Sequence, residues 1–284
     1  MVEQQPEVRM VRGQFTTWDG LRLYHRWWES GEEVRAVMVV VHGIGEHSGW
    51  YESTAERLVP LGLRVETFDL RGHGRSGGER ALVRSFDEYL NDLEVFLGAV
   101  RERNADLPFL LFGHSMGGVI SALYVIDRQP DLQGLLLSAP AIDISGAAPA
   151  VLVSLGKFIG RLFPRLPTVT IASANVFRDP EMANRYDADP LVYHRGIKAR
   201  TGAELNAAGQ RIREHAGDIR IPLLIMQGTE DQLTEFTASR ELYEHAGSED
   251  KTFHSYDGWR HDLLHDPEKE RVLGDLSRWI QAHL

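Results

Sequence analysis

Apolar residues along the chain gather into short runs that alternate with stretches of helical spacing. The densest run is Val34–Val41, which is almost entirely apolar and predicts a strand covered on both faces of a sheet. Residues 8–28 alternate around Asp19-Gly20, a dipeptide typical of tight turns, and predict a β-hairpin. Further apolar runs predict strands at 64–68, 109–112, 132–138, 222–227 and 251–256.

Helical spacing separates most of these strands, at 51–61, 86–103, 116–127 and 267–283. Strands that alternate with helices favour a sheet whose strands run mostly parallel. We therefore predict an α/β fold, with a mostly parallel, eight-stranded sheet and helices on both of its faces.

The alternation breaks between Ala141 and Gly217. Because this segment follows the end of a strand, we predict that residues 141–217 form a helical cap over a site, between two parts of the core at 1–140 and 218–284. Two interpretations of the cap's apolar stripe stay open: a face packed onto the body of the protein, or a partly exposed lid that contacts a lipid aggregate. The residues of this stripe are Val151, Leu152, Leu155, Phe158, Ile159 and Leu162.

Composition narrows the class of protein. The 284 residues, 43% of them hydrophobic and 25% charged, are typical of a soluble domain. A formal charge of −10 argues against nucleic acid and against electrostatic attachment to anionic membranes, and a chain without cysteine has no thiolate chemistry. The chain begins without a signal-like stretch and has no run of bilayer length, so we expect a cytoplasmic protein that contacts membranes, if at all, peripherally through the cap. The oligomeric state stays open.

The strand at 109–112 leads directly into a Gly-x-Ser-x-Gly pentapeptide centred on Ser115. Gly113 and Gly117 permit a tight turn from strand to helix, so that the serine hydroxyl projects above the sheet edge. Because a serine hydroxyl is a weak nucleophile, it needs a neighbouring base, and the base needs an acid to orient it.

Two later strand ends supply these groups. Asp231 follows the strand at 222–227, and His261 follows the strand at 251–256. The order Ser115, Asp231, His261 is the one found in α/β-hydrolases and predicts a catalytic triad. Glu230 is the alternative acid, and the neighbouring histidines His254 and His265 are expected to be structural.

A backbone site for a developing negative charge is also predicted. His42-Gly43-Ile44-Gly45 directly follows the strand at 34–41. A strand that ends in this way places one backbone N–H beside the nucleophile, and the residue after the nucleophile supplies a second. We expect the N–H groups of Ile44 and Met116 to form this oxyanion hole, and His42 to hold the loop by hydrogen bonding rather than to transfer protons.

Several stretches together resemble the monoacylglycerol lipase group of the α/β-hydrolase superfamily, which includes bacterial monoglyceride lipases and lysophospholipase-type enzymes. The similarity runs from about residue 14 to the end, with the order and spacing of the motifs kept. One departure is Trp50, which stands where many relatives carry arginine. The stretches include His42-Gly-Ile-Gly-Glu-His-Ser-Gly-Trp-Tyr, Asp69-Leu-Arg-Gly-His-Gly-Arg-Ser, Gly113-His-Ser-Met-Gly-Gly, Asp189-Pro-Leu and Pro267-Glu-Lys-Glu.

The resemblance implies a serine hydrolase that cleaves a lipid ester, most simply a monoacylglycerol, through an acyl-enzyme and without a metal or an organic cofactor. It also implies that Glu46 lies near the polar head group. The further residues expected to contact the substrate are His114 and, unless they fill the core of the cap, Phe158, Ile159 and Leu162. The alternatives are a lysophospholipase, a general carboxylesterase, a proline-type aminopeptidase or, against the complete triad, a non-catalytic binding protein.

Overall fold

One sheet organises the molecule. The computed structural model describes residues 7–144 and 158–284, and their eight strands follow the order β1-β2-β4-β3-β5-β6-β7-β8. Only β2 is antiparallel to its neighbours β1 and β4, and all the other pairs are parallel. The predicted α/β fold with a mostly parallel sheet is therefore confirmed. The strands are β1 (Arg9–Thr16), β2 (Arg22–Glu29), β3 (Ala36–Val41), β4 (Leu63–Phe68), β5 (Phe109–His114), β6 (Gly134–Ser138), β7 (Leu223–Gly228) and β8 (Lys251–Tyr256).

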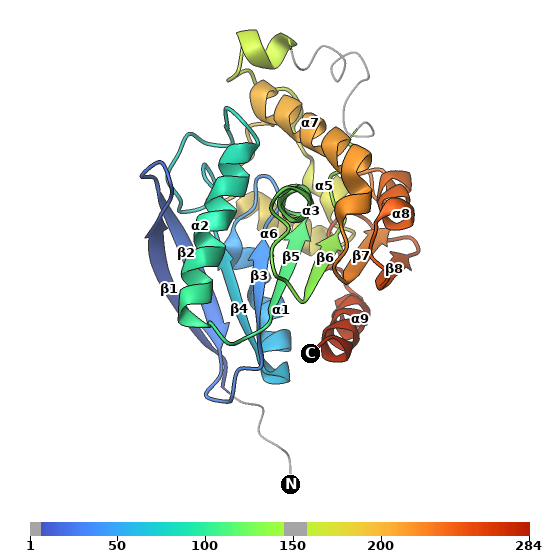
Figure 1. The fold of residues 1–284 in the computed structure, drawn as a ribbon. Coiled ribbons are helices and arrows are strands. Elements are labelled where there is room, and N and C mark those ends of the chain that lie inside the picture. The colour runs from blue at the N-terminus through green and yellow to red at the C-terminus, as the bar shows by residue number, and fades with distance from the viewer. Residues whose placement is uncertain (1–6, 145–157) are drawn as a thin grey trace.

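Helices cover both faces of the sheet (Figure 1). One face carries α2 (Asp87–Arg103), α3 (Met116–Arg128), α7 (Ala199–His215) and α8 (Phe236–His245), and the other carries α1 (Glu52–Leu58) and α9 (Lys269–Ala282). Two short helices, α5 (Ser173–Val176) and α6 (Pro180–Ala188), lie between β6 and β7, and the 3-10 turns are η1 (Ser48–Tyr51), η2 (Val59–Leu61) and η4 (Ala216–Asp218).

The central strand β3 shows why its sequence is apolar throughout. Val37, Val39 and Val41 pack into the core shared with α2, α3, α7 and α8. The intervening residues Ala36, Met38 and Val40 pack into the core shared with α1 and α9. Successive side chains of a strand point to opposite faces, so a strand buried on both sides needs apolar residues at every position.

The segment between β6 and β7 stands over the end of the sheet toward which the parallel strands point (Figure 1). Its described part contains a helical turn at 158–162 and then α5, α6 and α7. Of the predicted apolar stripe, Val151, Leu152 and Leu155 lie outside the described residues. Within the described part of the chain, no helix is both long and apolar enough to cross a membrane.

Candidate active site

Ser115 occupies a sharp turn between β5 and α3. Its φ of 54° and ψ of −121° lie in a region that serine rarely adopts. Both flanking glycines are required by close backbone contacts: a Cβ at Gly113 would lie 2.4 Å from the Gly117 oxygen, and a Cβ at Gly117 would lie 2.0 Å from the Val41 oxygen. The pentapeptide therefore holds the serine at the edge of the sheet, directly beside the end of β3.

Asp231 and His261 are brought together from the loops that follow β7 and β8. His261 Nδ1 lies 2.8 Å from Asp231 Oδ2, and the alternative acid Glu230 is exposed. The Asp231 carboxylate also accepts hydrogen bonds from Gln227 Nε2 at 2.7 Å and from the Thr234 hydroxyl at 2.7 Å. Burial by itself raises the pKa of Asp231, but His261, the Leu233 N–H and the Thr234 hydroxyl outweigh it and lower the pKa to about 2. The carboxylate is therefore ionised at neutral pH and favours the tautomer of His261 whose proton is on Nδ1.

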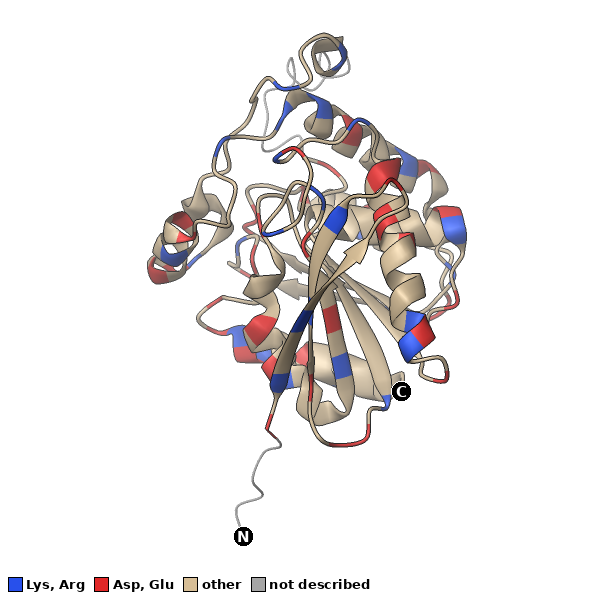
Figure 2. Ribbon diagram, turned by 90° about the vertical axis from the view of Figure 1, so that its left-hand side faces the viewer, with Lys and Arg blue, Asp and Glu red and all other residues tan. Residues whose placement is uncertain are grey.

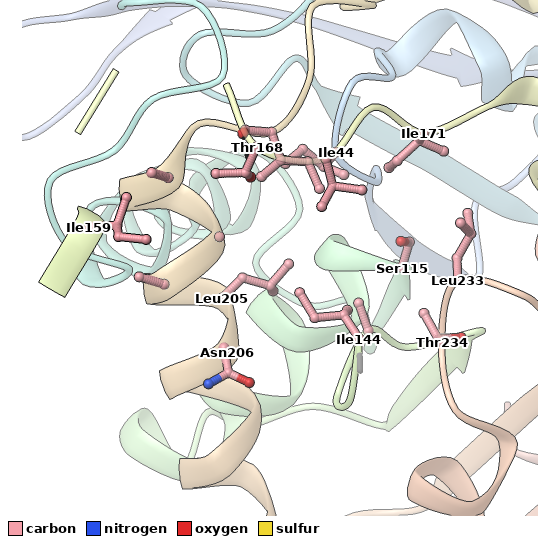
Figure 3. A pocket seen from close by; sticks show the side chains of 16 residues that line it. Ile44, Ser115, Ile144, Ile159, Thr168, Ile171, Leu205, Asn206, Leu233 and Thr234 are labelled. Carbon is pink, nitrogen blue, oxygen red and sulfur yellow. Dashed lines mark hydrogen bonds between the residues drawn. The ribbon is translucent and has the colours of Figure 1, made fainter. Parts of the chain in front are cut away.

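Ser115 lines an apolar pocket that extends beneath the segment between β6 and β7 (Figure 3). In this view Ser115 and Ile159 lie at opposite ends, with Ile144 and Leu205 between them. Of the predicted acyl-channel residues, only Ile159 lines the pocket, whereas Phe158 and Leu162 are exposed. The lining consists of Ile44, Ser115, Ala141, Ile144, Ile159, Thr168, Val169, Ile171, Ile197, Ala199, Gly202, Ala203, Leu205, Asn206, Leu233 and Thr234.

The two predicted oxyanion donors come from the loop after β3 and from the start of α3. Ile44 lines the same pocket as Ser115, and Met116 is the first residue of α3. The first N–H groups of a helix have no acceptor within the helix, and the helix dipole favours negative charge there. The backbone N–H of Met116 therefore has no acceptor within α3, and it lies next to the serine in the chain.

Behind the Asp231–His261 pair lies a buried cluster of four charged side chains, which we call the buried ion cluster: Glu46, His114, Asp262 and His265. Glu46 Oε1 lies 3.5 Å from His114 Nε2, and Asp262 Oδ2 lies 2.9 Å from His265 Nδ1. The His114 ring centroid is 4.9 Å from that of His261. Neither Glu46 nor His114, both expected to contact the substrate, is among the residues that line the pocket at Ser115.

The protonation states of this cluster follow from its pairing. Burial lowers the pKa of His114, but the carboxylates of Glu46, Asp262 and Asp231 outweigh it and raise the pKa to about 9. Burial raises the pKa of Glu46, and His114 reverses this and lowers it to about 2. In the same way His265 lowers the pKa of Asp262 despite burial. Asp262 in turn outweighs burial and raises the pKa of His265. Each carboxylate of the cluster thus faces a histidine whose pKa is raised.

Three of these residues also have the spacing of a metal site. Among residues 7–144 and 158–284, the ligand atoms of Glu46, His114 and Asp262 form the single group that lies within 4.8 Å of one another. Metal ligation needs a deprotonated imidazole nitrogen. His114 Nδ1 lies 3.1 Å from the Ser138 oxygen, and the carboxylates near the ring raise its pKa to about 9, which favours a proton on Nε2 as well. The donor set therefore fits ion pairs better than a metal.

The sequence reasoning singled out Glu46 and His114 as residues that contact substrate, but it did not predict the cluster that they form with Asp262 and His265. It treated His265 as structural and did not single out Asp262, although Asp262 directly follows His261. The spacing of the Asp262–His265 pair, three residues apart, is the only signal in the sequence that indicates a local contact.

Comparison with known proteins identifies the class. Residues 32–268 match the family described as serine aminopeptidase, S33. The chain is 35% identical over 265 residues to the monoacylglycerol lipase of Mycolicibacterium smegmatis, which covers 93% of this chain and 95% of that one. It is 28% identical over 248 residues to phospholipase YtpA of Bacillus subtilis, covering 87% and 95% of the two chains.

A solved structure agrees with these sequence matches. The crystal structure of Paleococcus ferrophilus monoacylglycerol lipase has a TM-score of 0.81 and 31% sequence identity, covering 97% of this chain and 100% of that chain. The chain therefore belongs to the serine aminopeptidase S33 family of α/β-hydrolases. Within that family it is a monoglyceride lipase-like member, as the sequence motifs predicted.

The buried ion cluster predicts a specific pH dependence of stability. The pKa of His114 is raised from 6.5 to about 9 in the folded protein, so its contribution is fully present below pH 6.5 and is lost as the pH rises through 9. A shift of this size corresponds to about 3 kcal/mol. Urea titrations should show the free energy of unfolding falling between pH 6.5 and 9.5. The fall should be much smaller in Glu46→Gln, and an equal fall in both proteins would contradict the pairing.

Proposed function

We propose that this protein hydrolyses the ester bond of monoacylglycerols and releases glycerol and a fatty acid. The observation that carries the proposal is that Ser115 lines an apolar pocket in a protein that also holds a buried Asp231–His261 pair. Pockets with apolar walls and a few polar groups at one end suit ligands with an alkyl chain and one reactive group. The monoacylglycerol lipases among the relatives support glycerol as the alcohol.

In the proposed mechanism, His261 Nε2 takes the proton of Ser115 Oγ while Oγ attacks the ester carbonyl carbon. Asp231 keeps the His261 proton on Nδ1 and stabilises the imidazolium that forms. The carbonyl oxygen becomes an oxyanion, which accepts hydrogen bonds from the N–H groups of Ile44 and Met116. When the tetrahedral intermediate collapses, the alcohol oxygen leaves with the proton from His261, and the acyl group stays on Ser115. A water molecule, deprotonated by His261, then attacks the acyl-enzyme and releases the fatty acid.

Residues 141–217 act as the cap in this proposal, because they contribute most of the pocket wall opposite Ser115. The wall from α7 consists largely of small residues, which leave room for an alkyl chain. The small residues are Ala199, Gly202 and Ala203. Further along the helix, the larger Leu205 and Asn206 also line the pocket.

A peptidase function is less well supported than an esterase function, although the family is named for an aminopeptidase. A free amino terminus needs an unpaired carboxylate in the pocket. Glu46, the acidic side chain expected near the substrate, already faces His114 and lines no part of the pocket. The phospholipase relative favours lysophospholipid as the second candidate substrate.

A substrate panel tests the proposal. Purified protein and Ser115→Ala should be compared on monoacylglycerols of graded chain length, lysophosphatidylcholine, triacylglycerol and p-nitrophenyl acetate, with fatty acid release as the measurement. We expect monoacylglycerols to give the highest kcat/KM, and the variant to lose at least about 10³-fold. A clear preference for lysophosphatidylcholine would overturn the substrate assignment but not the nucleophile. An active Ser115→Ala would overturn the mechanism.

We also propose that the cap contacts lipid surfaces through a cluster that we call the cap patch: Phe158, Leu162, Phe163 and Leu166. Their exposed fractions are 66%, 54%, 62% and 47%, and Trp18 is the only other large hydrophobic residue that is exposed in the described part of the chain. The patch is adjacent in sequence to Ile159, which lines the pocket, so a lipid surface at the patch would lie next to the acyl site. Arg161 and Arg165, both exposed, lie within the same segment, and Figure 2 shows Lys and Arg at this end of the molecule, so basic groups accompany the apolar ones.

Replacing Phe158, Leu162 and Phe163 together by serine tests the cap patch. We expect co-sedimentation with phosphatidylcholine vesicles and hydrolysis of vesicle-borne monoacylglycerol to fall several-fold, while hydrolysis of dissolved p-nitrophenyl butyrate is unchanged. Trp18→Ser is the matched control, since Trp18 is equally exposed but lies in the turn between β1 and β2. Equal losses in the control, or unchanged sedimentation of the triple variant, would contradict the proposal.

A further inference from the structure

Hydrogen bonds at both the carbonyl oxygen and the N–H of Gly43 hold the loop that follows β3. His42 Nδ1 lies 2.7 Å from the Gly43 oxygen, and His42 Nε2 accepts a hydrogen bond from the Leu70 N–H at 2.9 Å. Because Nε2 acts as the acceptor, the proton of His42 is on Nδ1 and is donated to the Gly43 oxygen. Burial lowers the pKa of His42, which keeps the ring neutral and preserves this arrangement.

This hydrogen bond orients the next donor. The oxygen of Gly43 and the N–H of Ile44 belong to the same peptide unit, and in a trans peptide the two point in opposite directions. Fixing the oxygen toward His42 therefore turns the Ile44 N–H away from His42. Ile44 lines the pocket together with Ser115, so its peptide forms part of the wall beside the nucleophile.

Glu46 holds the other side of Gly43. The Gly43 N–H donates to Glu46 Oε2 at 3.2 Å, and the Tyr51 hydroxyl donates to the same oxygen at 3.1 Å. The second oxygen, Oε1, faces His114 Nε2 at 3.5 Å. Oε2 of Glu46 thus accepts two hydrogen bonds from the protein, and Oε1 forms an ion pair with His114.

Packing around Gly43 leaves little space between the serine and this carboxylate. A Cβ placed on Gly43 would lie 3.1 Å from Ser115 Cβ and 3.3 Å from Glu46 Oε1. Both side chains therefore pack against the Cα of Gly43 on the side where a Cβ would lie, so a larger residue there would disturb the serine and Glu46 together. A ligand of the leaving alcohol would need a free oxygen directed into the pocket, and Glu46 is buried and does not line it.

We infer that Glu46 is a positioning residue for the oxyanion hole: with His114 as its counter-ion, it holds the Gly43–Ile44 turn in the conformation that directs the Ile44 N–H to the oxyanion. This inference rests on the proposed roles of Ser115 and Ile44. It differs from the expectation that Glu46 contacts the glycerol head group, because it predicts an effect on every ester, whatever its alcohol.

The consequence is a specific kinetic signature. An oxyanion donor acts in the transition state, so disturbing it lowers kcat and leaves KM nearly unchanged. Losing one such donor outright costs about 10²–10³-fold in kcat, and a misdirected donor costs less. We therefore expect about a 10- to 100-fold loss of kcat in Glu46→Ala. Glu46→Gln should lose less, because its amide oxygen still accepts from the Gly43 N–H.

The experiment compares two esters with the same acyl chain, 1-decanoylglycerol and p-nitrophenyl decanoate. Wild-type protein, Glu46→Gln and Glu46→Ala are assayed on both esters. Active sites are counted by fluorophosphonate titration, so that kcat is expressed per folded, active molecule. The matched control is Glu66→Gln. Glu66 is also buried and ion-paired, but its partners are Arg64 and Arg103, and it is on β4 away from the cluster.

Parallel losses of kcat on both esters, partly rescued in Glu46→Gln and absent in Glu66→Gln, are the expected result. A rise in KM for 1-decanoylglycerol alone would overturn the inference and establish Glu46 as a ligand of the alcohol. Unchanged kinetics on both esters would overturn it as well. If the wild-type protein hydrolysed only the p-nitrophenyl ester, the proposed substrate would fail, and the comparison on that ester would still test the role of Glu46.

Discussion

Ser115 holds a backbone conformation that costs about 1–3 kcal/mol, and the surrounding sheet supplies the packing that makes it stable. The turn is confined by β3 on one side and α3 on the other, with the Gly117 backbone so close to the Val41 oxygen that no side chain fits between them. The same confinement brings the end of β3 and its His42–Ile44 loop next to the serine. The same packing therefore fixes both the position of the nucleophile and the position of the oxyanion loop.

Ion pairs between buried side chains also stabilise the region behind this turn. A buried ion pays a desolvation cost of several kcal/mol, which only a close partner offsets, and removing one partner of a buried pair costs about 3–5 kcal/mol. The buried ion cluster meets this condition by pairing each carboxylate with a histidine, Glu46 with His114 and Asp262 with His265. Its members contact the oxyanion loop through Glu46 and the His261 ring through His114. The cluster thus links the two halves of the proposed site.

The sequence predicts the parts of this architecture that depend on local pattern. A strand buried on both faces must be apolar throughout, and parallel strands end at one edge, so Asp231 and His261 could be placed together from their positions alone. Helix α7 lies within the predicted helical cap, but its bounds were not predicted, because its buried face uses small residues such as Ala208 and Gly209, which leave no strong apolar stripe. A Cβ at Gly209 would lie 2.1 Å from the Ile142 oxygen, so close helix packing explains the small residue. The pairing of Glu46 with His114 joins distant segments and has no local signal.

The most direct test of the account is to trap the acyl-enzyme. Rapid acid quench after mixing the protein with p-nitrophenyl decanoate, followed by intact-mass and peptide mass spectrometry, locates the acyl group. The account predicts one decanoyl adduct per chain, on the peptide that contains Ser115, formed in a burst and lost as fatty acid is released. An adduct on another residue, or steady turnover without any adduct, would contradict it.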